Sequence, residues 1–334
     1  MRIGLSFDLK PDKAPVNEYI DDSMEEYDSM ETVRLIESSI EANGHQVTLL
    51  GGGKTFLDNI RREKVDFVFN IAEGQGNYRG RESQVPAVLE MLDIPYSGSD
   101  SLCLGVCLDK ELAKKMVAME GIITPKWQML SDIKKLHSID WKEFRFPLMI
   151  KPAHEGSSKG VRLSSVVMNM GELETEAKRQ FDGYNQALII EEFIGGDEIT
   201  VGITGNEPPQ VLAMMRVLPR KKTEHFVYSI EVKRDYLKQV DYECPPKLDT
   251  SVLQSLEDAS LKIFNILGCR DFARIDFRLD NNGNPYFIEI NPLPGLGNHS
   301  DLVLMADMMG ISHIALIKKI LATALKRYSL CINQ

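Results

Sequence analysis

The chain has 334 residues, of which 43% are hydrophobic and 26% charged, the composition of a globular protein with two or three domains. Its formal net charge of −10 argues against a general nucleic-acid-binding protein, because phosphate backbones are bound by basic surfaces. No apolar run reaches the length of a transmembrane helix, and the N-terminal apolar stretch is too short for a signal peptide. Five cysteines, in spacings unlike those of metal sites, fit a reducing cytoplasm. We therefore expect a cytoplasmic protein without nucleic-acid or membrane partners.

The first hundred residues alternate strand and helix patterns. Strands are expected at 2–7, 46–50 and 65–70, and helices at about 29–43, 55–63 and 85–92. Asp28 and Glu31 have the spacing of a capping box at the start of the first helix, and Gly44 would end it. This alternation implies a parallel sheet with right-handed crossovers, whose ligands bind at the carboxyl ends of its strands. The loops after Phe7 and Asn70 lie at such ends.

The middle section continues with mixed elements, and the last section is richer in strands. The expected elements of the middle section are a helix at 110–120, strands at 148–151 and 161–164, a helix at 172–180 and a strand at 187–192. The chain closes on an amphipathic helix at about 311–328, whose apolar stripe indicates core packing. These patterns predict a protein of the α/β (α+β) class.

Two strand patterns near the C-terminus are joined by Asn282-Gly283, a strong signal of a tight hairpin. Apolar and polar residues alternate in both patterns, so each strand would have one apolar and one polar face. The two expected strands are 273–279 and 285–291.

A two-residue turn would place four polar side chains on one face of this hairpin, with Asp276 opposite Glu289 and Arg274 opposite Asn291. Facing carboxylates repel one another and call for a cation, and oxygen ligands of this kind suit Mg²⁺. The neighbouring arginine suggests an anionic substrate or a charge that builds up in a transition state. The alternative is a surface hairpin with scattered polar residues, although the β-branched and aromatic residues of the other face imply burial.

A Gly/Ser-rich segment at 151–161 has the composition of a phosphate-binding loop. Lys151 stands at the end of a strand and provides a fixed cation. Gly156 and Gly160 free the backbone to turn its N–H groups around an anion. The alternative is a flexible, exposed hairpin loop.

Two further segments contain turns that permit close backbone approach to a ligand. In 188–198 a buried strand pattern leads to a Gly-Gly turn, where backbone groups could bind a flat base and Glu198 could bind ribose hydroxyls. In 291–300 a Pro/Gly-rich stretch directly follows the carboxylate hairpin, and Ser300 provides a hydroxyl there. A solvated strand end and a plain Pro/Gly turn are the respective alternatives.

Taken in order, these segments resemble the ATP-grasp superfamily and, within it, the D-alanine–D-alanine ligases, over about residues 66–328. The motifs that carry the resemblance are Leu108-Asp109-Lys110, Lys151 to Gly160, Glu191 to Glu198, Ala273 to Asp276, and Glu289 to Asn291 with Pro294-Gly295 and His299-Ser300. It implies an ATP-grasp fold with an N-terminal parallel-sheet domain at 1–100, a central domain at 101–192 and a C-terminal domain at 193–334.

The resemblance also implies a role for each matching residue. The ATP-binding residues would be Lys110, Lys151, Ser158, Glu191, Glu192, Phe193, Ile194 and Glu198. The ligands of two Mg²⁺ ions, or of Mn²⁺, would be Asp276, Glu289 and Asn291. Arg274, Ser157 and Lys233 would be catalytic, Arg274 by stabilising the tetrahedral intermediate, while Gly295 and Ser300 would line the substrates.

The activity implied is ATP-dependent ligation of two small amino acids, in which a carboxylate forms an acyl phosphate and an amine then displaces the phosphate. Small-molecule substrates and a homodimer are the implied partners. One alternative is a ligase for another amino acid or small carboxylate. Another is a nucleotide-binding regulatory protein without turnover, against which the intact set of Arg274, Asp276, Glu289 and Asn291 argues.

The N-terminal half departs from the family pattern in two loops. The loop at 8–27 is long and acidic where the family has a Gly-rich loop with one glutamate. Arg79 and Arg81 stand where the family has an acidic element, so one of them could pair with a substrate carboxylate. The alternative is an arginine folded back onto the acidic loop.

A third departure concerns the mobile loop that carries Lys233. The family usually follows this lysine with tyrosine, whereas here Arg234 and Asp235 come before Tyr236. The register of this loop is therefore open.

Overall fold

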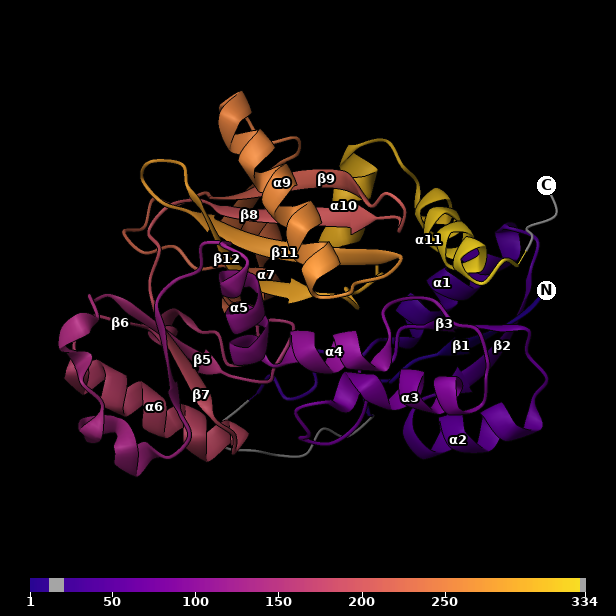
Figure 1. The fold of residues 1–334 in the computed structure, drawn as a ribbon, viewed down its shortest axis with the longest axis horizontal. Helices are drawn as coiled ribbons and strands as arrows, with labels where there is room; N and C mark the ends of the chain where they lie inside the picture. The colour runs from indigo at the N-terminus through magenta and orange to yellow at the C-terminus, as the bar shows by residue number, and fades with distance from the viewer. Residues whose placement is uncertain (12–20, 331–334) are drawn as a thin grey trace.

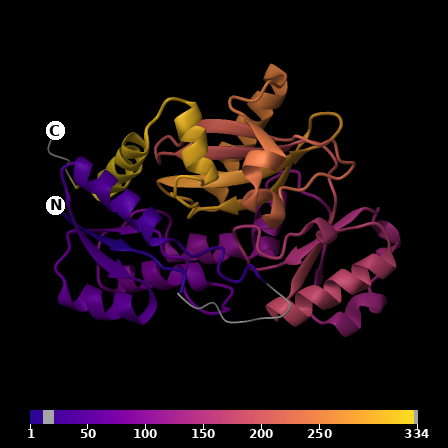
Figure 2. The same ribbon diagram turned by 180° about the vertical axis from the view of Figure 1, so that it is seen from behind.

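The computed structural model describes residues 1–11 and 21–330 and contains three sheets, one in each section of the chain (Figure 1). The N-terminal and central sections lie at opposite ends, and the C-terminal section lies against both (Figures 1 and 2). No single helix among the described residues is long and apolar enough to cross a membrane. Helices α10 (Asp301–Met308) and α11 (His313–Arg327) pass that test of length and composition only as a pair, and the two are bent by 111°.

The N-terminal sheet is parallel, as the alternating pattern predicted, with strand order β2-β1-β3. Its elements are β1 (Arg2–Ser6), α1 (Met30–Ala42), β2 (Gln46–Gly51), α2 (Gly53–Arg62), β3 (Phe67–Asn70) and α3 (Gln84–Met91), with a 3₁₀ turn at Arg81–Ser83 before α3. The expected capping box at Asp28 and Glu31 is wrong. Ser29 caps α1 instead, because its hydroxyl accepts the N–H of Thr32.

The central sheet is antiparallel, with strand order β4-β7-β5-β6. The elements of this section are α4 (Ser101–Leu108), α5 (Lys110–Met119), β4 (Trp127–Leu130), β5 (Leu148–Pro152), β6 (Val166–Val167), α6 (Met170–Tyr184) and β7 (Leu188–Glu192), with 3₁₀ turns at Ile133–Ser138, Trp141–Glu143 and Leu163–Ser165. The strand expected at 161–164 is wrong, because a 3₁₀ turn begins at Leu163 and the pairing with β5 begins only at Val166.

The C-terminal sheet has the order β10-β9-β8-β11-β12. The elements are β8 (Glu198–Thr204), β9 (Gln210–Pro219), α7 (Ile230–Arg234), α8 (Tyr236–Gln239), β10 (Val240–Glu243), α9 (Thr250–Ile266), β11 (Phe272–Leu279), β12 (Pro285–Asn291), α10 (Asp301–Met308) and α11 (His313–Arg327). Helix α9 was not predicted, although Leu256, Ile263 and Phe264 follow a helical period and are buried against the sheet.

One hydrophobic core joins the first and last sections of the chain. Side chains of the N-terminal sheet and of α1 pack with those of α10 and α11, and α11 lies beside α1 (Figure 2). The buried residues of α1 that face α11 belong to this cluster, including Ile36 and Ile40. This shared core anchors the N-terminal sheet relative to the C-terminal one.

The strands of the hairpin pair as predicted at the end that carries the polar side chains, but the turn differs. Asp276 pairs with Glu289 and Arg274 with Asn291, whereas beyond a bulge Phe277 pairs with Phe287. The N–H of residue 280 donates to the carbonyl of residue 284 at 3.0 Å, so the loop consists of residues 281–283. The predicted two-residue turn is therefore wrong by one residue, and the bulge restores the predicted register at Asp276 and Glu289.

Three cysteines come together in the core around α4. The sulfur of Cys103 lies 3.8 Å from that of Cys107 and 3.6 Å from that of Cys269, and all three side chains are buried. Cys103 and Cys107 lie four residues apart on α4, whereas Cys269, between α9 and β11, is brought to them by the tertiary fold.

Candidate active site

The polar face of the β11–β12 hairpin carries the predicted group of four side chains. Arg274 donates to Asp276 at 2.8 and 3.1 Å, and the Asn291 amide donates to Asp276 at 3.4 Å. Arg274 also pairs with Asp301, the first residue of α10, at 3.1 Å. Asp301 was missed in the sequence, although it directly follows the predicted Ser300.

The two facing carboxylates have different electrostatic surroundings. Burial raises the pKa of Glu289, but Lys110, Lys151 and other nearby cations outweigh it and lower the pKa to about 2. Burial raises the pKa of Asp276, and Arg274 only partly offsets this. Glu289 therefore stays ionised at neutral pH. An ionised carboxylate, a second carboxylate and an amide oxygen on one face are a donor set that fits a hard divalent cation.

Two lysines reach toward this carboxylate face from other elements. Lys110 begins α5, where Asp109 caps the helix, and its ammonium lies 3.6 Å from Glu289. Lys151 stands in β5 and pairs with Glu191 of β7 at 3.0 Å. Burial lowers the pKa of Lys151, but Glu191 and Glu289 more than offset this, so its pKa lies above the ordinary value.

Glu191 lies between two buried lysines. Besides Lys151 it pairs with Lys114 at 2.7 Å, and the side chain of Lys114 has no exposed surface. Burial lowers the pKa of Lys114 to about 8, although Glu191 acts in the opposite direction. Lys114 was missed in the sequence, and its spacing of four from Lys110 along α5, which places both on one helix face, was the available signal.

A first pocket opens between the central and C-terminal sheets. Of the predicted residues it is lined by Lys151, Ser158, Glu191, Glu192, Phe193, Ile194, Glu198, Lys233, Asp276 and Glu289. Apolar side chains such as Met149 and Val227 complete the lining. Apolar walls with a few charged groups are typical of a small-molecule site and suit a nucleotide, which has a flat base and charged phosphates.

Glu198, expected to hold ribose hydroxyls, already has partners. It pairs with Arg278 of β11 and accepts the N–H of Tyr228 at 3.1 Å. The Arg278 guanidinium also lies over the ring of Phe193, 4.5 Å from its centroid. Arg278 was missed in the sequence, although it follows Arg274 and Asp276 on the same face of the strand.

A second pocket lies further along the same polar face of the hairpin, toward the N-terminal sheet. Of the predicted residues it is lined by Lys110, Ser157, Arg274, Glu289, Asn291, Gly295 and Ser300. A Cβ atom on Gly295 would lie 2.8 Å from the Ser300 hydroxyl, so the close approach of these two residues requires glycine. Glu289 and the Lys110 ammonium near it lie where the two pockets meet.

Arg79 and Arg81 are not brought into either pocket. Arg81 donates to Glu26 at 2.6 Å and to Glu155 at 3.1 Å, and its side chain is 4% exposed. Arg79 is mostly exposed and pairs with Asp109 at 2.9 Å. The expectation that they face the substrate is corrected in favour of the alternative, an arginine folded back onto the acidic N-terminal loop.

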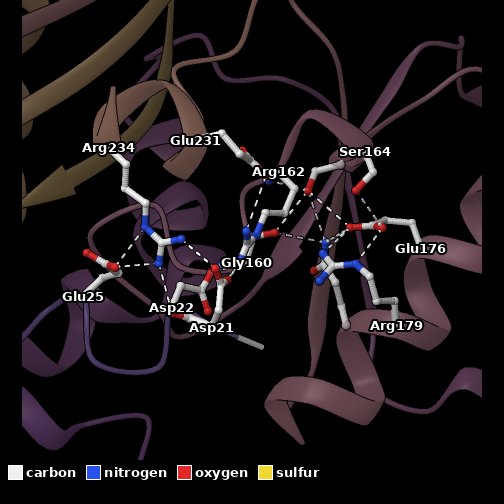
Figure 3. A network of polar contacts seen from close by, with 12 residues as sticks. Asp21, Asp22, Glu25, Gly160, Arg162, Ser164, Glu176, Arg179, Glu231 and Arg234 are labelled. Carbon is white, nitrogen blue, oxygen red and sulfur yellow. Dashed lines mark hydrogen bonds and ion pairs between the residues drawn. The ribbon is translucent and has the colours of Figure 1, made fainter. Parts of the chain in front are cut away.

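The Gly/Ser loop offers its N–H groups to carboxylates of the same chain. The N–H of Gly156 donates to Glu26 at 2.7 Å. The N–H of Gly160 donates to Asp22 at 3.0 Å (Figure 3). Ser157 and Ser158 between them have φ of 49° and 59°, in the left-handed region. Acidic residues of the N-terminal segment thus occupy donors that the sequence suggested for an anion.

Arg162 and Arg234 connect the acidic N-terminal residues to the central section and to α7, the helix that carries Lys233. Arg234, the last residue of α7, pairs with Asp21 at 2.7 Å and Glu25 at 2.6 Å (Figure 3). Arg162 pairs with Asp21 and with Asp22. We call residues 21–26 the acidic strap, because they join the Gly/Ser loop to α7.

The contacts of α7 distinguish the directions of its two basic residues, Lys233 and Arg234. Lys233 lines the first pocket, with its ammonium 4.9 Å from the ring centroid of Tyr228. Arg234 turns instead toward the acidic strap, and the Tyr236 hydroxyl lies 3.1 Å from His299. Lys233 and Arg234 therefore point to different partners.

A pocket between two antiparallel sheets, with lysines and a carboxylate hairpin at one end, is the arrangement of the ATP-grasp class of ligases. The family model described as "D-ala D-ala ligase C-terminus" matches residues 112–322. The D-alanine–D-alanine ligase of Aquifex aeolicus is 31% identical, over 88% of this chain and 94% of that protein. The chain belongs to the D-alanine–D-alanine ligase family.

Two further similarities bear on the fold and on the substrate. The crystal structure of D-alanine–D-alanine ligase from Bacillus anthracis complexed with ATP superimposes with a TM-score of 0.75 and 26% identity, covering 98% of each chain. "Uncharacterized protein y4sG" of Sinorhizobium fredii is 35% identical, over 88% of this chain and 87% of that protein. The chain is therefore similar both to named ligases and to a relative without an assigned substrate.

Proposed function

We propose that this protein uses ATP to activate the carboxylate of one small amino acid and joins it to the amine of another. The observation that carries the proposal is the position of Glu289 and Lys110 where the two pockets meet. A nucleotide in the first pocket would then have its phosphates beside an amino acid in the second. D-Ala-D-Ala is the product named for the relatives, and another amino-acid pair is the alternative.

In the reaction proposed, the carboxylate of the first amino acid attacks the γ-phosphate of ATP, and ADP leaves. The acyl phosphate so formed is attacked at its carbonyl carbon by the amine of the second amino acid. Phosphate leaves, the amine loses a proton, and an amide remains. Phosphoryl transfer of this kind depends mainly on positioning and on charge stabilisation.

The residues of the chain divide these tasks. Lys151, held by Glu191, and Lys110 would bind phosphate oxygens as fixed cations. Arg274, oriented by Asp276 and Asp301, would stabilise the oxyanion of the tetrahedral intermediate. Ser157 and Ser300 would position the amino acids, and Lys233 would close the pocket from α7.

Asp276, Glu289 and Asn291 would hold the divalent ions. Such ions supply charge neutralisation at the transferring phosphate. Mg²⁺ is the ion that the all-oxygen donor set favours, with Mn²⁺ as the alternative. A homodimer and a cytoplasmic location stay predictions from the family resemblance.

The test is to incubate the purified chain with ATP, Mg²⁺ and pooled D- and L-amino acids, and to measure phosphate release and product mass. We expect amino-acid-dependent release and a dipeptide mass. Asp276→Asn should lower the rate at least 100-fold, whereas Asp258→Asn on the exposed face of α9 should not change it. ATP binding without phosphate release in any amino acid would contradict the proposal and favour a regulatory nucleotide-binding protein.

A further inference from the structure

The wall of the second pocket that lies toward the N-terminal sheet is formed by carboxylates. Asp28, Glu73 and Glu82 line this wall, which we call the acidic wall. They come from the segment before α1, the loop after β3, and the 3₁₀ turn before α3. Three elements of the N-terminal section therefore direct acidic residues to one side of the proposed amino-acid pocket.

The other carboxylates of this pocket have cationic partners. Glu26 pairs with Arg81 at 2.6 Å and with Lys159 at 3.2 Å. Glu155 pairs with the same two cations, Glu25 pairs with Arg234, and Glu289 lies 3.6 Å from Lys110. In these pairs each cation neutralises a carboxylate other than those of the acidic wall.

The acidic wall itself is unpaired. Within residues 1–11 and 21–330, no ion pair or side-chain hydrogen bond is made by the carboxylates of Asp28, Glu73 or Glu82. Glu82 is only 7% exposed, and it lines the second pocket. An unpaired carboxylate that is buried and lines a pocket calls for a ligand with positive charge.

The electrostatics of the wall agree with this geometry. Burial raises the pKa of Glu82 to about 7, and Arg81 and Lys110 only partly oppose this. Burial, with Asp8 as a like charge, also raises the pKa of Asp28 to about 7. Burial and the neighbouring Glu82, Glu26 and Asp28 raise the pKa of Glu73. A cation in the pocket would relieve this accumulation of like charges.

We propose that the acidic wall binds a positively charged side chain of one amino-acid substrate, so that this substrate is a basic amino acid with a second ammonium or a guanidinium group. The inference rests on the proposed function. The α-ammonium common to all amino acids needs one carboxylate, whereas this wall provides three.

A metal ion fits the acidic wall less well than an organic cation. Metal ligands must converge on one point, with oxygen atoms about 2.0–2.6 Å from the ion. Among the described residues, the thiols of Cys103, Cys107 and Cys269 are the one group of three His, Cys, Asp or Glu ligand atoms within 4.8 Å of one another. The carboxylates of the wall are more widely spread, as suits an ammonium with several donors.

The experiment compares basic amino acids with uncharged ones of similar length. Lysine, ornithine and 2,4-diaminobutyrate, each in D and L form, are supplied singly or with alanine, beside norleucine and norvaline. Phosphate release and product mass are measured with ATP and Mg²⁺. We expect kcat/KM for the best basic amino acid to exceed that for its uncharged counterpart at least 10-fold.

Glu82→Gln and Glu73→Gln keep the side-chain size and remove one charge each. We expect either variant to lower kcat/KM for the basic substrate at least 10-fold and to change that for the uncharged one less than 3-fold. Glu63→Gln, at the exposed end of α2, is the matched control and should alter neither. Thermal unfolding of each variant establishes that it is folded, and a preference that survives in both folded variants overturns the inference.

The outcomes separate this inference from the proposed function. Turnover with alanine or norleucine but no preference for basic amino acids overturns the acidic wall as a substrate site and leaves the ligase function standing. If no amino acid supports phosphate release, the ligase function fails. Calorimetric titration with lysine and ornithine then tests separately whether the acidic wall binds a basic amino acid. Binding that weakens at least 10-fold in Glu82→Gln supports the wall, and absence of binding overturns it.

Discussion

The guanidinium of Arg81 donates to the carboxylate of Glu26 at 2.6 Å, and each side chain is 4% exposed. Glu26 also accepts the N–H of Gly156 at 2.7 Å. Through these contacts the pair joins the loop before α3, the acidic strap and the Gly/Ser loop of the central domain. An arginine at a position where the family has an acid thus connects the N-terminal and central sections of the chain, and its guanidinium is taken up by carboxylates of the same chain.

We expect Arg81→Ala to lower the free energy of unfolding by about 3 kcal/mol. Its removal leaves Glu26 buried with Lys159 as the remaining charged partner, and breaking a buried ion pair typically costs 3–5 kcal/mol. Arg79→Ala is the matched control, because its side chain is exposed and such pairs contribute about 0–1 kcal/mol. Urea denaturation measures both. Unchanged stability of Arg81→Ala, with a raised KM for an amino acid, would restore the substrate role.

We expect the acidic strap to hold the mobile loop closed. In Arg234→Ala the contacts to Asp21 and Glu25 are lost, so the loop at 220–222, rich in exposed Arg and Lys, should be cut faster by trypsin. The rate of ligation should fall several-fold, because closure protects the acyl phosphate from water. Lys238→Ala, on the exposed side of α8, should change neither rate. Equal cleavage of wild type and Arg234→Ala would show that the strap does not restrain the loop.

The strap should open at low pH. Hydrogen bonds from Arg162 and Arg234 lower the pKa of Asp21 from its usual 3.8 to about 2. Since the pKa is lowered in the folded state, the contribution of these contacts is present above about pH 4 and is lost as the pH falls toward 2. Trypsin does not cut well there, so pepsin cleavage of the strap between pH 4 and 2 is the measurement. Asp21→Asn should show the faster cleavage already at pH 4.

We expect Lys233→Ala to lower kcat/KM for ligation about 100- to 1000-fold, as typically follows loss of one group that stabilises transition-state charge. Lys233 lines the first pocket and contributes to the lowered pKa of Glu289, which places its ammonium near the proposed phosphate site. Steady-state kinetics with Lys238→Ala as control provide the measurement. A loss of less than threefold would show that Arg234, not Lys233, faces the reaction.

We expect Glu82→Gln to stabilise the ligand-free protein near pH 7. Burial raises the pKa of Glu82 to about 7, so the folded state holds a proton that the unfolded state has lost above about pH 4.5. Stability therefore falls as the pH rises from about 4.5 to 7, and a neutral glutamine avoids this loss. The gain should be roughly 1–3 kcal/mol at pH 7 and near zero at pH 4.5. Parallel denaturation curves at the two pH values test it, and a gain independent of pH would contradict the assignment.

The hairpin shows how a local pattern can predict a site despite an error in the detail. Alternation placed Arg274, Asp276, Glu289 and Asn291 on one face, and the contacts among them agree. The turn was predicted one position away from where it forms, and the bulge after Asp276 compensates. Turn type and bulge position depend on how the strands twist against β8, and no local propensity encodes this.

What the sequence by itself determined is the chemistry carried by each segment: the carboxylate face of the hairpin, the lysine at the end of β5, and the parallel order of the N-terminal sheet. These features follow from the pattern of apolar residues along the chain, which repeats every two residues in a strand and every 3.6 residues in a helix. Such patterns can be seen within a short stretch of sequence. Only the tertiary structure decided which charges meet. Arg81 pairs with Glu26 and Lys114 with Glu191, and each pair joins segments far apart in the chain. Asp28, Glu73 and Glu82 have no ion-pair partner among residues 1–11 and 21–330. Burying a charged group costs free energy unless an opposite charge or a ligand compensates it, and only the folded protein determines which groups are buried together.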